Sequence, residues 1–391
     1  MKITKLSLAT AIAIGSITCA NAQPLEEAIK NVEVSGSVAY RYNDYEENNS
    51  SVKGDSSTSN LYKAAINIGT KVNDDVKFNS RFIAGNKANA GEVSLNTQAD
   101  SDSNVDIFLS EVNFSYTGVQ NTIITLGKQA VVTPFTISRD SIGNESTGTG
   151  VVAATHYGDL VSLTGGYFNQ TNFDNNDGHA LDTIGIDGSE SFYYVTGTLA
   201  YAGATLDASY ADLQDEFDAY SIGLTGNYDI ADLKLNPYAR YSSLDLDSSD
   251  DKNSLWKTGI QANLGIFGAY LAYGQTDKEG GTVGLDDSSD AGMDDHWRVT
   301  LSGISDASAI YASVDAQVTE KVNVALKYSG IDVGANSNDL DQNEIYVQTK
   351  YKMSSNLSTY LRLGQLEKTN YYGTNDDLKS NMGRLHVEYS F

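Results

Sequence analysis

The sequence contains very little cysteine and proline for its length. Its 391 residues include one cysteine and 3 prolines, against 35 glycines and 25 tyrosines. Because Cys19 is the single cysteine, no disulfide within the chain can stabilise the fold. Beyond the N-terminal segment, no apolar run approaches the roughly 20 residues that a membrane helix needs. Turn signals recur along the chain and helix patterns are few, so an all-β fold is the natural interpretation.

Basic residues are also scarce. The chain has 26 Lys and Arg against 51 Asp and Glu, which gives a formal net charge of −25. This acidity excludes nucleic acid as an expected partner, because phosphates bind basic surfaces. The acidic residues either keep loops soluble or create a negative potential that attracts cations.

Histidines number only 4, at positions 156, 179, 296 and 386. None lies in a local nucleophile or metal motif such as HExxH. His386 lies two residues from Glu388 on the polar face of the last predicted strand, which fits a polar lining better than a catalytic pair. We therefore predict that the chain is not an enzyme and has no catalytic residues.

The N-terminus has the features of a secretory signal peptide. Two lysines precede an apolar core, and the Ala-Asn-Ala segment at 20–22 fits the small-residue cleavage site. A lipoprotein signal through Cys19 is the competing interpretation, but threonine is a poor residue before a lipidated cysteine. We predict that residues 1–22 are removed and that residues 23–391 form a single domain.

What the sequence does contain is alternation with a period of two. In the last segment Leu385, Val387, Tyr389 and Phe391 alternate with polar or charged residues. This period places the two sets on opposite faces of a β-strand. One face is apolar or aromatic throughout and the other is polar or charged throughout, so we interpret the first as contacting lipid and the second as contacting water. The pattern resembles the terminal strand of bacterial outer-membrane barrels, and it identifies Phe391, Tyr389 and Val387 as a candidate assembly signal.

The same alternation recurs along the chain in units of strand, long loop, strand and short turn. Counting gives 18 strands of roughly 8 to 12 residues, with long loops on one side and short turns on the other. The segment 296–304 alternates weakly, and we assign it to the loop 276–307 because an extra strand breaks the even count. The predicted fold is an all-β, 18-stranded antiparallel transmembrane β-barrel in the bacterial outer membrane.

The polar faces of these strands carry many charges, including Arg41, Lys63 and Glu111. These charged side chains cannot all be buried without water, because unpaired charges are very costly in a medium of low dielectric constant. Barrels of about 16 to 18 strands leave an aqueous channel, whereas barrels of about eight strands are filled by side chains. The predicted lumen is therefore filled with water.

Three stretches resemble a known family. They read GKQAVVTPFTISRDSIGNESTGTG at 127–150, PLEEAIKNVEVSGSVAYRY at 24–42 and LHVEYSF at 385–391. Together they resemble the major outer membrane porins of Campylobacter and its relatives. The resemblance implies a trimeric porin that passes small hydrophilic solutes and favours cations, with a third loop folded into the lumen. It also implies contact with the lipid bilayer and lipopolysaccharide, and insertion by the barrel-assembly machinery.

The residues of the third loop agree with an inward fold. Proline does not continue a central strand, so Thr133, Pro134 and Phe135 should set the shape of the loop. Carboxylates on this loop, facing a basic wall, would create a transverse field that sorts solutes by charge. The predicted constriction comprises Arg139, Asp140 and Glu145 on the loop, and Arg41, Lys63, Arg81 and Glu111 on the wall. The alternative is that the two loop carboxylates are ordinary solvated charges.

Calcium is the one cofactor that the sequence leaves open. Hard oxygen ligands suit this ion, which could bind at the constriction, and the acidic segment 286–295 is a candidate for weak binding on the outside of the barrel. The segment 174–178 lacks EF-hand spacing. We expect no other cofactor.

Two further functions are compatible with the sequence. A substrate-specific channel can share the same strand number, but it needs a continuous binding track. A surface adhesin fits the loops 170–190 and 276–307, which we expect to be long and exposed. The leading prediction is a general diffusion porin with a preference for cations.

Overall fold

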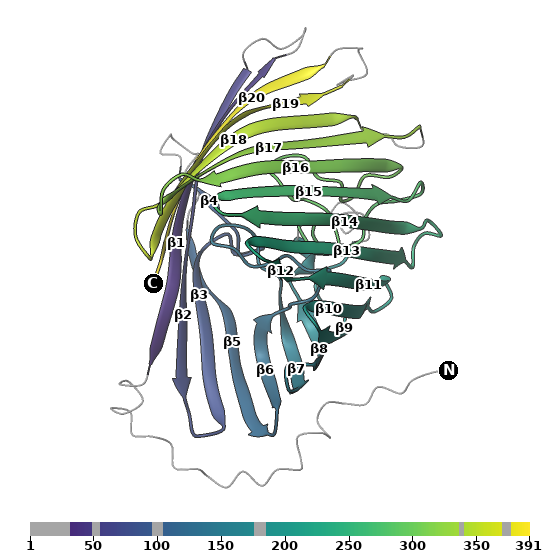
Figure 1. The fold of residues 1–391 in the computed structure, drawn as a ribbon. Helices are drawn as coiled ribbons and strands as arrows, with labels where there is room; N and C mark the ends of the chain where they lie inside the picture. Colours follow the sequence, from purple (N-terminus) through teal and green to yellow (C-terminus); the bar gives the residue numbers. More distant parts are fainter. Residues whose placement is uncertain (1–31, 49–54, 96–104, 176–184, 336–339, 370–376) are drawn as a thin grey trace.

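The computed structural model describes residues 32–48, 55–95, 105–175, 185–335, 340–369 and 377–391. The predicted signal peptide at 1–22 and part of the loop 170–190 lie outside the described residues. All the strands of the described chain belong to one antiparallel sheet (Figure 1). Among these residues, no helix is long and apolar enough to span a bilayer.

The strands and the short helix of the described residues follow each other in a simple order. They are β1 (Glu33–Asn48), β2 (Asp55–Lys71), β3 (Val76–Gly85), β4 (Val93–Ser94), β5 (Asp106–Val119), β6 (Thr122–Ala130), β7 (Thr147–Tyr157), β8 (Val161–Thr171), the 3₁₀ helix η2 (Phe173–Asn175), β9 (Phe192–Tyr201), β10 (Ala204–Leu213), β11 (Phe217–Gly226), β12 (Tyr228–Ile230), β13 (Leu233–Leu246), β14 (Asn253–Leu264), β15 (Phe267–Thr276), β16 (Ala307–Gln317), β17 (Val322–Val333), β18 (Gln342–Lys352), β19 (Leu357–Lys368) and β20 (Leu378–Ser390).

The sheet closes into a barrel. Each long strand pairs antiparallel with the next long strand, and β1 also pairs with β20 from Ser37↔Ser390 to Asn48↔Lys379. Two of the twenty strands are accessory: β4 pairs briefly with β2, and β12 continues β11 along β13. The other 18 form the wall, as predicted.

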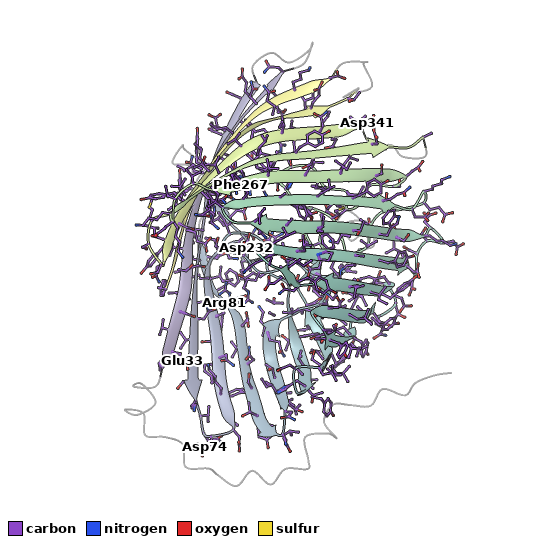
Figure 2. The ribbon with its side chains drawn as sticks, viewed as in Figure 1. Glu33, Asp74, Arg81, Asp232, Phe267 and Asp341 are labelled. Atoms are coloured by element: carbon purple, nitrogen blue, oxygen red, sulfur yellow. The ribbon has the colours of Figure 1, made fainter. Side chains whose placement is uncertain are left out.

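Loops and turns lie at opposite ends of the barrel, as the spacing of turn signals predicts. Figure 2 marks these ends, with Asp74, Asp232 and Phe267 at the short turns and Asp341 at the side of the long loops. The segment 296–304 contains no strand and lies in the β15–β16 loop, which confirms its assignment. The β1–β2 ladder continues through polar pairs, such as Asn43 to Ser59 at 3.1 Å, toward the first loop.

The two faces of the wall differ in the way that alternation predicts. Large apolar side chains such as Ile66, Phe114 and Leu363 are exposed on the outer face, which suits lipid. Lys63 and Arg81, on the other face, are buried inside the barrel.

The C-terminal residue completes the seam between β20 and β1. The N–H of Phe391 donates to the carbonyl of Gly36 at 3.0 Å, and the N–H of Gly36 donates back at 2.8 Å. The rings of Tyr389 and Phe391 stack 5.7 Å apart on the outer face, and Val387 pairs with Tyr40 on β1. The proposed assembly residues thus lie where the barrel closes, and their role as a signal remains a prediction.

Candidate functional site

The third loop, residues 131–146 between β6 and β7, folds back on itself immediately after the strand. The hydroxyl of Thr136 donates to the carbonyl of Val131 at 2.9 Å and accepts the N–H of Thr133 at 3.0 Å. This small network, with Pro134 between the two threonines, turns the chain away from the wall and buries Phe135 completely. The three residues predicted to set the loop shape therefore lie at its first turn.

Glu145 anchors the other end of this loop to the wall. Its carboxylate accepts Nζ of Lys63 at 2.8 Å and the Arg81 guanidinium at 2.6 and 2.9 Å. Nε of Arg139 lies 3.2 Å from the same carboxylate. Glu145 is 1% exposed and Lys63 is 0% exposed, so the pairing is shielded from water.

This arrangement keeps the Glu145 carboxylate charged. Burial raises the pKa of its carboxyl, but the Arg81 hydrogen bonds and the charges of Arg139 and Lys63 outweigh burial, so the pKa is lowered overall. Its three cationic partners neutralise it locally. Glu145, Lys63 and Arg81 therefore hold the loop against β2 and β3, instead of facing each other across open lumen as the sequence suggested.

Contacts of three successive residues, 139 to 141, fix the middle of the loop. Arg139 forms an ion pair with Glu111 on β5, and the hydroxyl of Ser141 donates to Glu388 on β20 at 2.9 Å. The carboxylate of Asp140 accepts the N–H groups of two following residues, including Ile142 at 2.8 Å. The loop is thus tied to strands on both sides of the β1–β20 seam, which shows that it lies inside the barrel.

The long loop between β15 and β16, residues 277–306, also folds inward. We expected this loop to be exposed, and the structure shows that this was wrong. Its apolar side chains are buried, namely Val283, Leu285, Met293, Trp297, Val299 and Leu301. Exposed apolar groups are costly in water, so these residues within an acidic segment were the sequence signal for an inward position.

Hydrogen bonds from polar side chains of the wall hold the loop 277–306 in place. The Glu344 carboxylate on β18 accepts the backbone N–H groups of Trp297 and Arg298, both at 3.0 Å. On β16 the Tyr311 hydroxyl reaches the carbonyl of Val299 at 2.8 Å. Lys257 on β14 donates to the carbonyl of Gly292. Glu344 was not among the predicted site residues.

The two inward loops are joined to each other. The N–H of Leu285 donates to the carbonyl of Phe135 at 2.7 Å, and the N–H of Ala291 donates to Pro134 at 2.7 Å. Ile137 and Ser289 form an isolated antiparallel bridge. Residues 134–137 of the third loop and residues 285–291 of the loop 277–306 therefore form one connected partition inside the barrel.

A cavity of about 620 Å³ lies on one side of this partition, and we call it the eyelet cavity. Its charged lining residues are Arg41, Glu92, Asp140, Asp286, Asp287, Asp294 and Arg298. Arg41 and Asp140 were predicted at the constriction. The other loop residues were not, because sequence reasoning placed the loop 277–306 outside.

A second cavity of about 780 Å³ lies on the other side of the partition. Ile137 and Ser138 border both cavities, so this stretch of the third loop separates them. The wall of the second cavity includes threonines of β8 to β10 and the Asp207–Arg240 ion pair, whose closest atoms are 2.9 Å apart. Cavities lined by polar and charged side chains therefore lie on both sides of the joined loops.

The expected outside position for calcium was also wrong. The acidic segment 286–295 belongs to the inward loop, and Asp286 is buried there. Among the described residues, no group of three or more His, Cys, Asp and Glu side chains is arranged to hold a metal ion.

Comparisons with known proteins agree with this architecture. Residues 1–190 match the family model described as the Campylobacter major outer membrane protein. Over this stretch, the chain is similar to that family. No curated protein matches the chain. This match and the closed barrel support placing the chain among the channels of the bacterial outer membrane.

Solved structures are similar over nearly the whole chain. OpdO from Pseudomonas aeruginosa is 15% identical with a TM-score of 0.70, covering 92% of this chain and 97% of OpdO. OccK1 (OpdK) from the same species is 13% identical with a TM-score of 0.71, covering 92% and 98%. A BenF-like porin from Pseudomonas fluorescens Pf-5 is 12% identical with a TM-score of 0.72, covering 93% and 99%. At these identities the likeness shows the fold alone.

Proposed function

We propose that the chain is a general diffusion porin that passes small hydrophilic solutes and prefers cations. The observation that carries this proposal is the lining of the eyelet cavity, in which five carboxylates accompany two guanidinium groups. A lumen with excess negative charge raises the local concentration of cations and repels anions. Glu145 contributes little to this excess, because its charge is paired with Lys63 and Arg81.

Removing eyelet carboxylates should reduce cation preference. We expect Asp287→Asn with Asp294→Asn to lower the cation-to-anion permeability ratio roughly twofold to fivefold, because each charge acts at short range in a watery dielectric. The measurement is the reversal potential of purified protein in planar bilayers under a salt gradient. Asp251→Asn, in an exposed loop away from the cavity, is the matched control. A double variant with the reversal potential of this control would contradict the proposal, as would the absence of any conductance.

Cation preference should also depend on pH through Asp294. Burial raises the pKa of this carboxyl to about 6, with further contributions from nearby Asp295 and Glu344. A raised carboxyl pKa means that the group is charged above about pH 6 and neutral below it. The permeability ratio should therefore fall as the pH is lowered from about 7.5 to about 5. Glu145 stays ionised through this range because its pKa is lowered.

The measurement is the reversal potential at several pH values. In Asp294→Asn the change near pH 6 should be absent, while the wild-type chain and Asp251→Asn should both show it. A pH profile that is identical in the wild-type chain and Asp294→Asn would rule out this residue as the source.

A substrate-specific channel is the second candidate, and a wall of arginines and aromatic rings favours it. The Arg362 guanidinium lies 4.8 Å from the Tyr360 ring and 5.4 Å from the Tyr346 ring, and Arg384 lies 5.3 Å from Trp297. Among the similar structures, OpdK was solved with vanillate. Large ohmic currents in bilayers would support the general porin, and small saturating currents would support the specific channel.

The other expected partners are proposals of the same kind. We propose that the chain is exported through its N-terminal signal, inserted by the barrel-assembly machinery and assembled as a homotrimer in contact with lipopolysaccharide. The seam at Phe391 and the family match over residues 1–190 support this route. The structure supports an adhesin role less than the sequence does, because the loop 277–306 packs inside the barrel.

A further inference from the structure

We propose that the eyelet cavity is a binding subsite for small dipolar solutes that carry a carboxylate and an ammonium group, such as free amino acids. This inference rests on the proposed diffusion channel and names a class of solute that the channel should favour. It is carried by the separation of opposite charges across one cavity, described below.

The positive groups of the cavity lie on the side of β1. Arg41 belongs to β1, and its ion-pair partner among the described residues is Glu92 at 4.0 Å, the outer limit of such a pair. Arg298 comes from the loop 277–306, but its guanidinium lies over the ring of Tyr45 on β1, 4.7 Å from the centroid. Both guanidinium groups therefore line the wall side of the cavity.

Four of the five carboxylates of the cavity belong to the two loops of the partition, whereas Glu92 lies beside Arg41 on the wall side. Asp286 and Asp287 are in the turn that leads to Ser289, the residue bridged to Ile137 of the third loop. The Asp294 carboxylate accepts a hydrogen bond from the Ser288 hydroxyl at 2.7 Å, so it lies beside the same turn of the partition. Carboxylates on the partition thus face guanidinium groups on the wall across one space.

The size of the space fits this class of solute. A cavity of about 620 Å³ is within the range of roughly 300–1,000 Å³ that is usual for small-molecule sites, and an amino acid occupies only part of it. Because the contacts are solvated, they favour entry without holding the solute, as conduction requires. A carboxylate can contact the wall while an ammonium group contacts the partition, so a dipolar solute gains from both sides and an uncharged solute from neither.

Alanine and its uncharged isomer lactamide test this inference, because they have the same atoms and similar size. Uptake is measured as the swelling rate of liposomes that contain the purified full chain. We expect alanine to enter about threefold to fivefold faster than lactamide, the factor given by two solvent-screened charge contacts. Arg41→Gln with Arg298→Gln, and separately Asp287→Asn with Asp294→Asn, should reduce the ratio to about one. Asp251→Asn should keep the wild-type ratio.

Lactamide uptake in the same vesicles shows that each variant still forms a channel. Equal rates of alanine and lactamide entry in the wild-type chain would overturn the inference while leaving the diffusion channel intact. A ratio that depends on the aspartates and not on the arginines would also overturn it, because attraction of the ammonium group alone would then suffice. If neither solute enters, the proposed diffusion function itself fails.

Discussion

Replacing Glu145 with glutamine is expected to release the third loop from the barrel wall and to increase the unitary conductance. The carboxylate is buried and pairs with Lys63, Arg81 and Arg139 at 2.6 to 3.2 Å. The variant leaves Lys63 buried without a counter-ion, and breaking a buried pair in this way costs about 3–5 kcal/mol. The wall contacts that remain for the loop are then chiefly Arg139 with Glu111 and Ser141 with Glu388.

Single-channel recording in planar bilayers measures the conductance, and limited proteolysis measures exposure of the loop 131–146. Glu367→Gln is the matched control, because it removes a carboxylate from the exposed pair with Lys379. Exposed pairs contribute little, so this control should behave as the wild-type chain. If Glu145→Gln kept both the conductance and the protease resistance of the control, the anchoring role would be wrong.

Glu344→Ala is expected to loosen the loop 277–306 and to remove part of the cation preference. The variant leaves the N–H groups of Trp297 and Arg298 without their acceptor, at about 1–3 kcal/mol for each buried donor. Ser329 also loses the carboxylate that accepts its hydroxyl at 3.0 Å. Because the loop carries Asp287 and Asp294 into the eyelet cavity, its release should move these charges away from the solute path.

The expected readouts are a larger unitary conductance and a lower cation-to-anion permeability ratio in the same bilayer recordings. Glu320→Ala provides the control, since this residue lies in the exposed β16–β17 turn at the opposite end of the barrel. Currents that match those of Glu320→Ala in both size and selectivity would show that the loop holds its position without Glu344.

The joined loops explain why both variants should have large effects. Leu285 and Ala291 bond to the third loop through backbone groups, so each loop is held both by the wall and by the other loop. Neither loop has regular secondary structure over most of its length to keep its shape. Their position therefore depends on a few buried polar anchors.

The third loop shows how far sequence reasoning extends toward the site. The fold at Pro134 and the inward position of the loop were expected, and the structure places Arg139, Asp140 and Glu145 on it. The sequence analysis expected Glu145 to face the basic wall across the lumen, but the structure pairs it directly with that wall. Its partners on β2 and β3 are 82 and 64 positions away in the chain. No local pattern reports whether a carboxylate that far from its partners is buried against them or open to water.

The sequence by itself determined the barrel. Each strand residue meets either lipid or water, and each turn needs its own residue types, so alternation and turn signals specify eighteen strands one position at a time. The tertiary structure alone decided what fills the barrel. The loop 277–306 is acidic like a solvated loop, and only a closed wall could supply Lys257, Tyr311 and Glu344 as anchors and give its apolar residues a place to pack. The position of this loop depends on groups that are distant in sequence and meet only after the cylinder has formed.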